Sequence, residues 1–442
     1  MISEGALPEL AAFRRVEKAL CLETEPRFGR LVCADDNESR PVHRWFRFKE
    51  GFSGHLLAEL LASMSDRPTR EIRLLDPFCG VGTSLLSAQE LSAGGVRIDA
   101  CGIERNPLIA FVARTKTAWP RIPPSQMLAD GARALANASR HAPAIPSLSS
   151  VKSGRCVTRY TTRKLLAIRD AIADGPEGAV RNALLLGLAS AIERLSRVRK
   201  DGRALRIVQR EAAPIVPTVT AKWQEMAADI LFMRRSVPNP PWPRVVLGDG
   251  REPLACGVQP ASVDLIVTSP PYPNNIDYSE VYKLELWLLG IIRKRQDFLA
   301  LRKSTFRSHP TSAFPDPCAE FLDEVRRGKL KVLLHPLLSR TEESPERWRY
   351  RLILGYFSDM WTALQQQLAC LRKGGRSFVV VGNSLHGRES PYLIPTDLVV
   401  ARIAQCIGFS VERVVISRSL RRRIPSNHFL RESIVSLRKS DA

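Results

Sequence analysis

The chain has 442 residues and a mass of 49.4 kDa, with 44% hydrophobic and 25% charged residues, which excludes disordered, collagen-like and coiled-coil chains. The length suggests two or three structural units, or one α/β core that carries insertions. The formal net charge of +21 favours a polyanionic partner, with nucleic acid the leading candidate, although charge alone also fits a merely basic globular protein.

Residues 1–39 show weak helical periodicity and are expected to form an N-terminal helical extension. Residues 40–119 contain an aromatic-rich loop, a leucine-rich helix and two strand–helix units. The first strand is expected at Ile72 to Leu75, the second at Cys101 to Ile103, and a helix begins near Pro107. Strands that alternate with helices predict an α/β fold with a doubly wound, mostly parallel sheet.

Two segments interrupt this pattern. Residues 120–240 are mostly helical between proline-rich borders, and residues 291–350 are basic and irregular, so both are expected to be insertions. The sheet pattern resumes in 241–290 and ends in 351–442. In this last part we expect helix 354–372, strand Ser377 to Val381, helix 396–407, strand Val411 to Ile416 and strand Ser433 to Leu437.

The segment DPFCGVGT, residues 76–83, stands where the first strand turns into a helix. Its glycines allow a tight turn and let the backbone approach a ligand closely at a helix N-terminus. Glu104 follows 22 residues after Gly82, at the end of the next strand, where an acid can bind ribose hydroxyls. Together these features predict a site for a nucleoside cofactor, against the alternative of a tight turn in any α/β protein.

The segment TSPPY, residues 268–272, follows an apolar strand that begins at Val263. Two prolines end the hydrogen bonding of the sheet and fix the loop. The loop can aim Ser269 Oγ and the carbonyl of Pro270 at an exocyclic amino group, while Tyr272 offers a ring for stacking a base. The alternative for a bare SPPY segment is a surface turn, which the preceding buried strand and DPFCGVGT argue against.

DPFCGVGT and TSPPY together resemble the two signature motifs of S-adenosylmethionine-dependent amino-methyltransferases that act on DNA bases. The SPPY form is most often seen in the cytosine-N4 branch, whereas the adenine-N6 branch more often has an acid or Asn in place of Ser269. The resemblance covers residues 40–118, 241–290 and 351–442, although many SPPY enzymes have the two motifs in the opposite order. It implies a class I methyltransferase (Rossmann-like) core, S-adenosylmethionine as the cofactor, double-stranded DNA as the substrate and a cognate restriction endonuclease as a candidate partner.

The resemblance also implies roles for individual residues. The first motif and the FKEGFS segment would hold the methionine end of the cofactor, the acid after the second strand its ribose, and an acid after the third strand its adenine. The cofactor-binding candidates are Phe52, Ser53, Asp76, Phe78, Gly80, Gly82, Thr83, Glu104 and Asp249. The catalytic candidates are Ser269, Pro270, Pro271 and Tyr272, with the target base flipped out of the duplex.

Basic clusters in the two insertions are the candidate DNA contacts, the alternative being solvated helix faces. We assign DNA contact to residues 120–240 and target recognition to residues 291–350. In the first insertion, Lys200 to Gly202 is expected to form a turn between two helices. The candidate residues are Arg197, Arg199, Lys200, Arg203, Arg206, Arg302, Lys303 and Arg307.

Nine cysteines without CxxC spacing, and histidines without metal-ligand spacing, favour a reducing compartment and no metal site. The N-terminus has no signal-peptide pattern, and the longest apolar stretch falls short of the roughly 20 residues of a membrane span. We therefore expect a cytoplasmic, nucleoid-associated protein without a membrane partner. Cys79 is expected to be a packing residue, and His309 is not expected to be catalytic.

The favoured function is methylation of the N4 amino group of a flipped cytosine at specific sites in double-stranded DNA. Adenine-N6 methylation is the nearest alternative, because the same loop can hold either amino group. An RNA guanine-N2 methyltransferase is more distant, since such enzymes usually have an acid before PPY. A catalytically inactive DNA-binding protein on the same fold is the fourth hypothesis, which the intact Asp76, Glu104, Ser269 and Tyr272 argue against.

Overall fold

The computed structural model describes residues 9–64, 71–145, 156–200, 205–342, 348–387, 392–420 and 428–441. Eight strands form the central sheet: β1 Leu22–Thr24, β2 Glu71–Asp76, β3 Arg97–Glu104, β6 Arg244–Leu247, β7 Val263–Thr268, β8 Leu371–Gly382, β11 Phe409–Ser419 and β12 Arg431–Lys439. Their spatial order is β1-β11-β12-β8-β7-β2-β3-β6. Strand β12 is antiparallel to both neighbours, and the other pairs are parallel.

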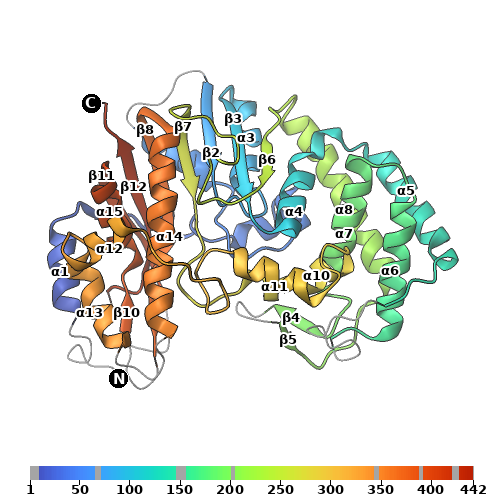
Figure 1. The fold of residues 1–442 in the computed structure, drawn as a ribbon. Helices are drawn as coiled ribbons and strands as arrows, with labels where there is room; N and C mark the ends of the chain where they lie inside the picture. Colours follow the sequence, from blue (N-terminus) through green and yellow to red (C-terminus); the bar gives the residue numbers. More distant parts are fainter. Residues whose placement is uncertain are drawn as a thin grey trace.

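This arrangement is the doubly wound, mostly parallel sheet of the class I methyltransferase (Rossmann-like) fold, as the sequence predicts. The helices are α1 Leu10–Lys18, α2 Leu56–Ser63, α3 Thr83–Leu91, α4 Pro107–Thr117, α5 Pro124–Asn137, α6 Arg159–Ala173, α7 Ala179–Ala191, α8 Ile215–Ser236, α9 Tyr278–Val281, α10 Lys283–Leu288, α11 Arg295–Ser304, α12 Ala319–Arg326, α13 Lys331–Glu342, α14 Trp348–Cys370 and α15 Thr396–Ile407. They cover both faces of the sheet, and α5 to α8 form a lobe beyond the β6 edge (Figure 1).

The N-terminal segment completes the opposite edge of the sheet. Strand β1 pairs with β11, with Leu22 opposite Val414. Helix α1 buries Phe13, whose ring meets that of Phe429 edge-on, with the ring centroids 5.7 Å apart. Residues expected to be a helical extension thus add a strand to the core sheet.

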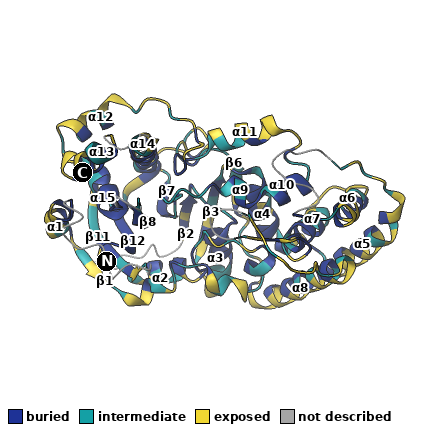
Figure 2. Cartoon of the chain, turned by 90° about the horizontal axis from the view of Figure 1, so that it is seen from below, coloured by how far each residue is buried: buried dark blue, intermediate teal, exposed yellow. Residues whose placement is uncertain are grey.

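The lobe of α5 to α8 packs around an apolar core that continues into α4 and α10, and its outer surface is exposed (Figure 2). The buried ring of Trp223 on α8 packs so closely on Gly131 and Gly187 that a Cβ at either glycine would lie under 3 Å from it. Asp229, also on α8, is buried and accepts hydrogen bonds from Arg44 and from the Trp45 indole. The lobe is thereby fixed to the 3₁₀ helix η4 (His43–Trp45), which leads toward the first motif.

Two local predictions were wrong. The expected turn at Lys200 to Gly202 does not join two helices, because Lys200 ends strand β4 (Val198–Lys200), which pairs antiparallel with β5 (Leu205–Ile207). Residues 201–204 lie outside the described residues. A second short pair is formed by β9 (Ser384–His386) and β10 (Tyr392–Ile394).

The segment 291–350, expected to be irregular, contains α11, α12, α13 and the start of α14, because its leucines and phenylalanines bury one helix face. Within the described ranges, no helix is long and apolar enough to cross a membrane.

Candidate active site

A cavity of about 420 Å³ lies at the carboxyl ends of the parallel strands. Gly80 follows β2, Glu104 ends β3, Asp249 follows β6 and Ser269 follows β7, and all four line the cavity. Ligands of open α/β sheets bind at this edge. The two sequence motifs therefore meet in one space, although they are far apart along the chain.

The glycine turn after β2 depends on left-handed backbone at Gly80 and Gly82, with φ angles of 52° and 81°. Asp76 is buried beneath this turn, where it accepts hydrogen bonds from the Phe78 backbone N–H at 3.2 Å and the Ser84 hydroxyl at 2.5 Å. Burial raises the pKa of Asp76 to about 6. The carboxyl group of Asp76 thus stabilises the glycine turn from its buried side.

Of the candidates in this motif, Phe78 and Gly80 line the cavity, whereas Asp76, Gly82 and Thr83 do not. Cys79 is buried, and burial raises the pKa of its thiol well above the usual value. This environment supports its expected packing role, because a buried protonated thiol is unreactive.

Glu104 lies at the carboxyl end of β3, with Oε1 accepting a hydrogen bond from the Asn106 backbone N–H at 2.7 Å. Asn106 caps α4 by accepting a bond from the Leu108 N–H, so the turn after Glu104 is fixed. Burial raises the pKa of Glu104 to about 7. Its carboxylate is placed to accept bonds from the hydroxyls of a ribose.

Asp249 also lines the cavity, but its carboxylate already binds Arg251. The Arg251 Nη2 lies 2.6 Å from Asp249 Oδ2, and Nη1 lies 2.9 Å from Asp359. Although burial acts to raise the pKa of Asp249, its hydrogen bonds and ion pair with Arg251 hold it below the usual range. Three N–H groups of Arg251 bind this carboxylate, from its backbone, Nε and Nη2. A carboxylate has about four acceptor positions, so about one is left for an adenine amino group.

Asp359 also binds Arg307, which was a candidate for DNA contact. The Arg307 Nη2 lies 2.7 Å from Asp359 Oδ1, and the side chain is 6% exposed. Arg307 is therefore a buried ion-pair partner, and its assignment as a phosphate contact is corrected.

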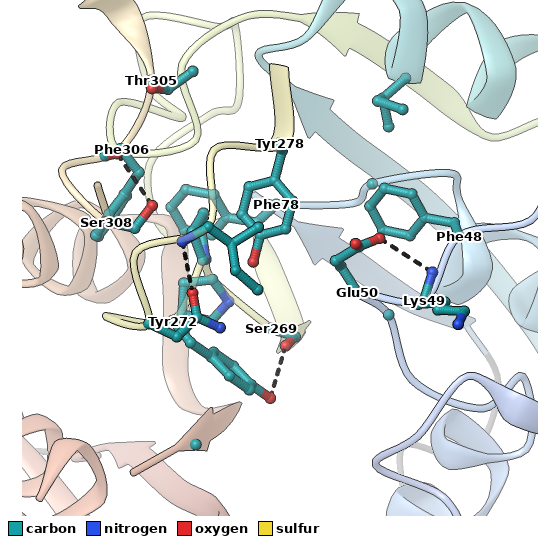
Figure 3. Close-up of a pocket in the computed structure, with 18 of the residues that line it drawn as sticks. Phe48, Lys49, Glu50, Phe78, Ser269, Tyr272, Tyr278, Thr305, Phe306 and Ser308 are labelled. Atoms are coloured by element: carbon teal, nitrogen blue, oxygen red, sulfur yellow. Dashed lines mark hydrogen bonds between the residues drawn. The ribbon is translucent and has the colours of Figure 1, made fainter. Parts of the chain in front are cut away.

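The catalytic loop follows β7, a strand whose residues are all buried. Ser269, Pro270, Pro271 and Tyr272 all line the cavity. The Ser269 hydroxyl donates to the Tyr272 hydroxyl at 3.3 Å, as Figure 3 shows, and Tyr272 donates to Glu432 at 2.7 Å. Because the Ser269 hydrogen is directed at Tyr272, the lone pairs of Ser269 Oγ are available to accept hydrogen bonds.

Glu432 on β12 is buried and also binds Arg418 on β11, at 2.6 Å between Arg418 Nε and Oε2. The Tyr272 ring packs on the backbone of Gly382, since a Cβ there would lie 2.8 Å from Tyr272 Cε2. Two C-terminal strands and the end of β8 thus fix the tyrosine on which the loop depends.

Phe52 and Ser53 do not line the cavity. Phe52 packs in the core, and Ser53 donates to Asp36 Oδ2 at 2.6 Å. The residues just before them, at positions 48–51, line the cavity instead. Phe48 covers the glycine turn, because a Cβ at Gly80 would lie 3.2 Å from its ring.

Further cavity residues were missed by sequence reasoning. Phe306, from the second insertion, meets Phe78 edge-on with centroids 5.6 Å apart, and Tyr278 and Glu50 complete the walls (Figure 3). Only Tyr278 had a usable signal, since it lies shortly after the SPPY motif. His309 also lines the cavity, but it is hydrogen-bonded to Thr305, and burial lowers its pKa.

Comparison with known proteins gives relatives for most of the chain. Type II methyltransferase M.AvaI of Nostoc sp. is 25% identical over 88% of this chain and 83% of its own length, and M.AvaI of Anabaena variabilis matches equally. Type II methyltransferase M.BsoBI of Geobacillus stearothermophilus is 24% identical over 95% of this chain and 88% of its own. The resemblance to methyltransferases is confirmed.

No family model matches the chain. The structure of an rRNA methyltransferase from Streptomyces viridochromogenes aligns over 91% of this chain and 86% of its own, with 11% identity and a TM-score of 0.32. S-adenosylmethionine is the methyl donor. The donor set fits it, because Glu104 and Asp249 offer carboxylates to its hydroxyl and amino groups beside a glycine turn.

The basic candidates for DNA contact lie in two places. Arg197, Arg199 and Arg206 are exposed on or beside the β4–β5 hairpin, where Arg199 stands opposite Arg206 in the register. Lys200 is turned inward, with its Nζ 2.5 Å from Glu285 and 4.2 Å from the Tyr282 ring centroid. Arg203 lies outside the described residues.

In the second insertion, Lys303 is exposed, whereas Arg302 pairs with Asp277 at 2.6 Å. The hairpin region therefore keeps three exposed arginine candidates close together, whereas the second insertion keeps one exposed candidate, Lys303. The hairpin is accordingly the stronger candidate surface for DNA phosphate.

Proposed function

We propose that the protein methylates an exocyclic amino group of a base in double-stranded DNA at specific sites. The observation that carries this proposal is the position of the SPPY loop, which opens into the cavity that Gly80 and Glu104 also line. The names of the type II methyltransferases support DNA modification beside a restriction activity. A cognate endonuclease is accordingly proposed as a functional partner.

S-adenosylmethionine, when bound, would supply an electrophilic sulfonium methyl group. The chain has to present an amino nitrogen in line with it, and the ring of the base draws the lone pair away from this nitrogen. As the nitrogen–methyl bond forms, the sulfur–methyl bond would break, so that S-adenosylhomocysteine leaves and the nitrogen loses one of its two hydrogens as a proton to water. Ser269 Oγ and the Pro270 carbonyl accept the two amino hydrogens, which favours a tetrahedral nitrogen in the transition state. The Ser269–Tyr272–Glu432 hydrogen bonds support this role, because they fix Ser269 Oγ as an acceptor.

A base within a duplex cannot reach this cavity, so we propose that it is flipped out and stacked on Tyr272. The exposed arginines of the β4–β5 hairpin bind the phosphates around it, and the second insertion takes part in target recognition. Base stacking on an aromatic ring contributes about 1–3 kcal/mol, so Tyr272→Ala is expected to weaken DNA binding as well as turnover.

We propose cytosine N4 as the target, because Ser269 stands where adenine-N6 enzymes more often have an acid or Asn. Adenine N6 is the alternative, since both amino groups offer the same two hydrogens. The proposal is tested by expression in a host without DNA methylation, followed by single-molecule sequencing of its DNA. A modified cytosine within a fixed motif supports it, and unmodified DNA with folded protein contradicts it.

A further inference from the structure

The cavity holds a carboxyl group that neither motif includes. Glu50 lies two residues after Phe48, lines the same cavity and is half-buried. In Figure 3 its carboxyl group lies across the pocket from the catalytic loop, on the side of Phe48 and facing Tyr278. Since the loop supplies the acceptors for an amino group, Glu50 is on the side where the remaining edge of a base would lie.

The two oxygens of Glu50 differ. Oε2 accepts a hydrogen bond from the Tyr282 hydroxyl at 2.8 Å and another from the Lys49 backbone N–H at 3.1 Å. Among the described residues, both hydrogen bonds that other residues donate to this carboxyl group go to Oε2, and the backbone N–H of Glu50 itself is a further donor to the group. Two donors on Oε2 leave Oε1 as the oxygen that carries a proton when the group is neutral.

The surroundings favour this neutral acid. Burial raises the pKa of Glu50, and the Tyr282 bond and the charge of Lys200 offset only part of that effect. Tyr278 and Tyr282 also lie near Glu50, and burial raises the pKa of both phenols well above the usual range, so they are uncharged. Lys200 is itself bound to Glu285, which further reduces its effect on Glu50.

We propose that Glu50, as a neutral acid, donates a hydrogen bond from Oε1 to the ring nitrogen beside the amino group of the flipped base. The proposal rests on the proposed function and deepens it. Cytosine N3 and adenine N1 are acceptors next to an amino group, whereas guanine N1 carries a hydrogen next to its amino group. A hydrogen-bond donor at this position therefore favours binding of cytosine or adenine and disfavours guanine. The acceptors of the catalytic loop alone could not make this distinction, because all three bases carry an amino group.

The test uses the full-length protein, saturating S-adenosylmethionine and a duplex carrying the mapped site. Turnover is compared for the natural target cytosine and for 3-deazacytosine, which lacks the N3 acceptor. In the wild type, the preference for cytosine is expected to fall as rising pH ionises Glu50. Glu50→Gln keeps an N–H donor without titrating, so its preference should persist across the pH range. Glu50→Ala should lose the preference and about tenfold in turnover on cytosine, the contribution of one hydrogen bond.

Tyr282→Phe gives an independent readout. It removes a hydrogen bond that favours the ionised form of Glu50, so the alkaline fall in preference should move to higher pH. Glu59→Gln, at a surface glutamate outside the cavity, is the matched control and should leave the profile unchanged.

The outcomes separate the two proposals. The role of Glu50 is overturned if the wild type and Glu50→Ala discriminate equally against 3-deazacytosine. It is also overturned if the wild-type preference for cytosine does not change with pH. In both cases the proposed methylation of DNA stands. Changed S-adenosylmethionine affinity in Glu50→Gln would place the group at the cofactor instead. Wild-type protein that transfers no methyl group to DNA would overturn the proposed function together with this inference.

Discussion

Gly382→Ala tests whether the position of Tyr272 controls turnover. The added Cβ would lie 2.8 Å from Tyr272 Cε2 and 2.9 Å from Cδ2, whereas carbon atoms in ordinary contact are about 3.5–4.0 Å apart. The ring therefore has to retreat by about 0.7 Å or more. Its hydroxyl would move with it, away from Glu432 and Ser269. Because a displacement of about 1 Å can reduce a rate about 100-fold, we expect kcat to fall between about tenfold and 100-fold.

The assay is single-turnover methyl transfer at saturating DNA and S-adenosylmethionine, with cofactor affinity measured by calorimetry. Cofactor affinity should be unchanged, because the three atoms nearest the new Cβ all belong to Tyr272 and none belongs to the glycine turn or Glu104. Gly94→Ala is the matched control, since no atom lies within 4 Å of the new Cβ. A folded Gly382→Ala variant with wild-type turnover would refute the reasoning that the fixed Tyr272 ring aligns Ser269.

Three further predictions follow from other contacts. Burial raises the pKa of Glu104 to about 7, and the ionised form would bind the ribose. The affinity for S-adenosylmethionine, measured by calorimetry, should therefore increase from pH 6 to pH 8. Glu104→Gln should remove this pH dependence. Replacing Arg197, Arg199 and Arg206 by Gln should lower DNA affinity and flatten its log–log salt dependence without changing cofactor affinity, and an unchanged slope would mean that the hairpin is only a solvated surface. Asp229→Ala should lower the free energy of unfolding by about 3 kcal/mol, because it leaves buried donors of the η4 segment unpaired. Urea titrations measure this change, and a value below about 1 kcal/mol would contradict the explanation.

The core of the fold could be predicted from the sequence because its signals are local. Strand β7 is a continuous apolar run, and β2 ends at a glycine turn, so both were found from periodicity and turn residues. The hairpin of β4 and β5 has only three residues in each strand, which is too few for an alternating pattern to be recognised. Its strands are defined by pairing with each other, which a reading of single segments does not detect.

Only the site residues that lie within a sequence motif could be predicted from the sequence. Ser269 and Tyr272 were found through SPPY, but Glu432, which holds Tyr272, is 160 residues further along the chain. Phe306 reaches the cavity from the second insertion, and Glu50 reaches it from a segment whose neighbours Phe52 and Ser53 were chosen instead. Such residues are brought to the site by tertiary packing, so neither spacing nor composition identifies them.

Arg307 shows that the position of a basic residue in the sequence does not by itself identify a DNA contact. Its place in a basic segment favoured DNA contact, but its side chain is buried against Asp359, 52 residues away. A charge count cannot separate a surface cation from the partner of a buried acid, because the partner is known only from the fold.

The most direct test of the central proposal is nucleoside mass spectrometry of unmethylated duplex DNA after incubation with the purified protein and isotope-labelled S-adenosylmethionine. We expect labelled N4-methylcytosine with the wild type, and a large loss of it with Ser269→Ala at unchanged cofactor affinity. Labelled N6-methyladenine in its place would contradict the choice of cytosine while keeping the amino-methyltransferase activity. DNA without any labelled base would contradict the proposed function itself.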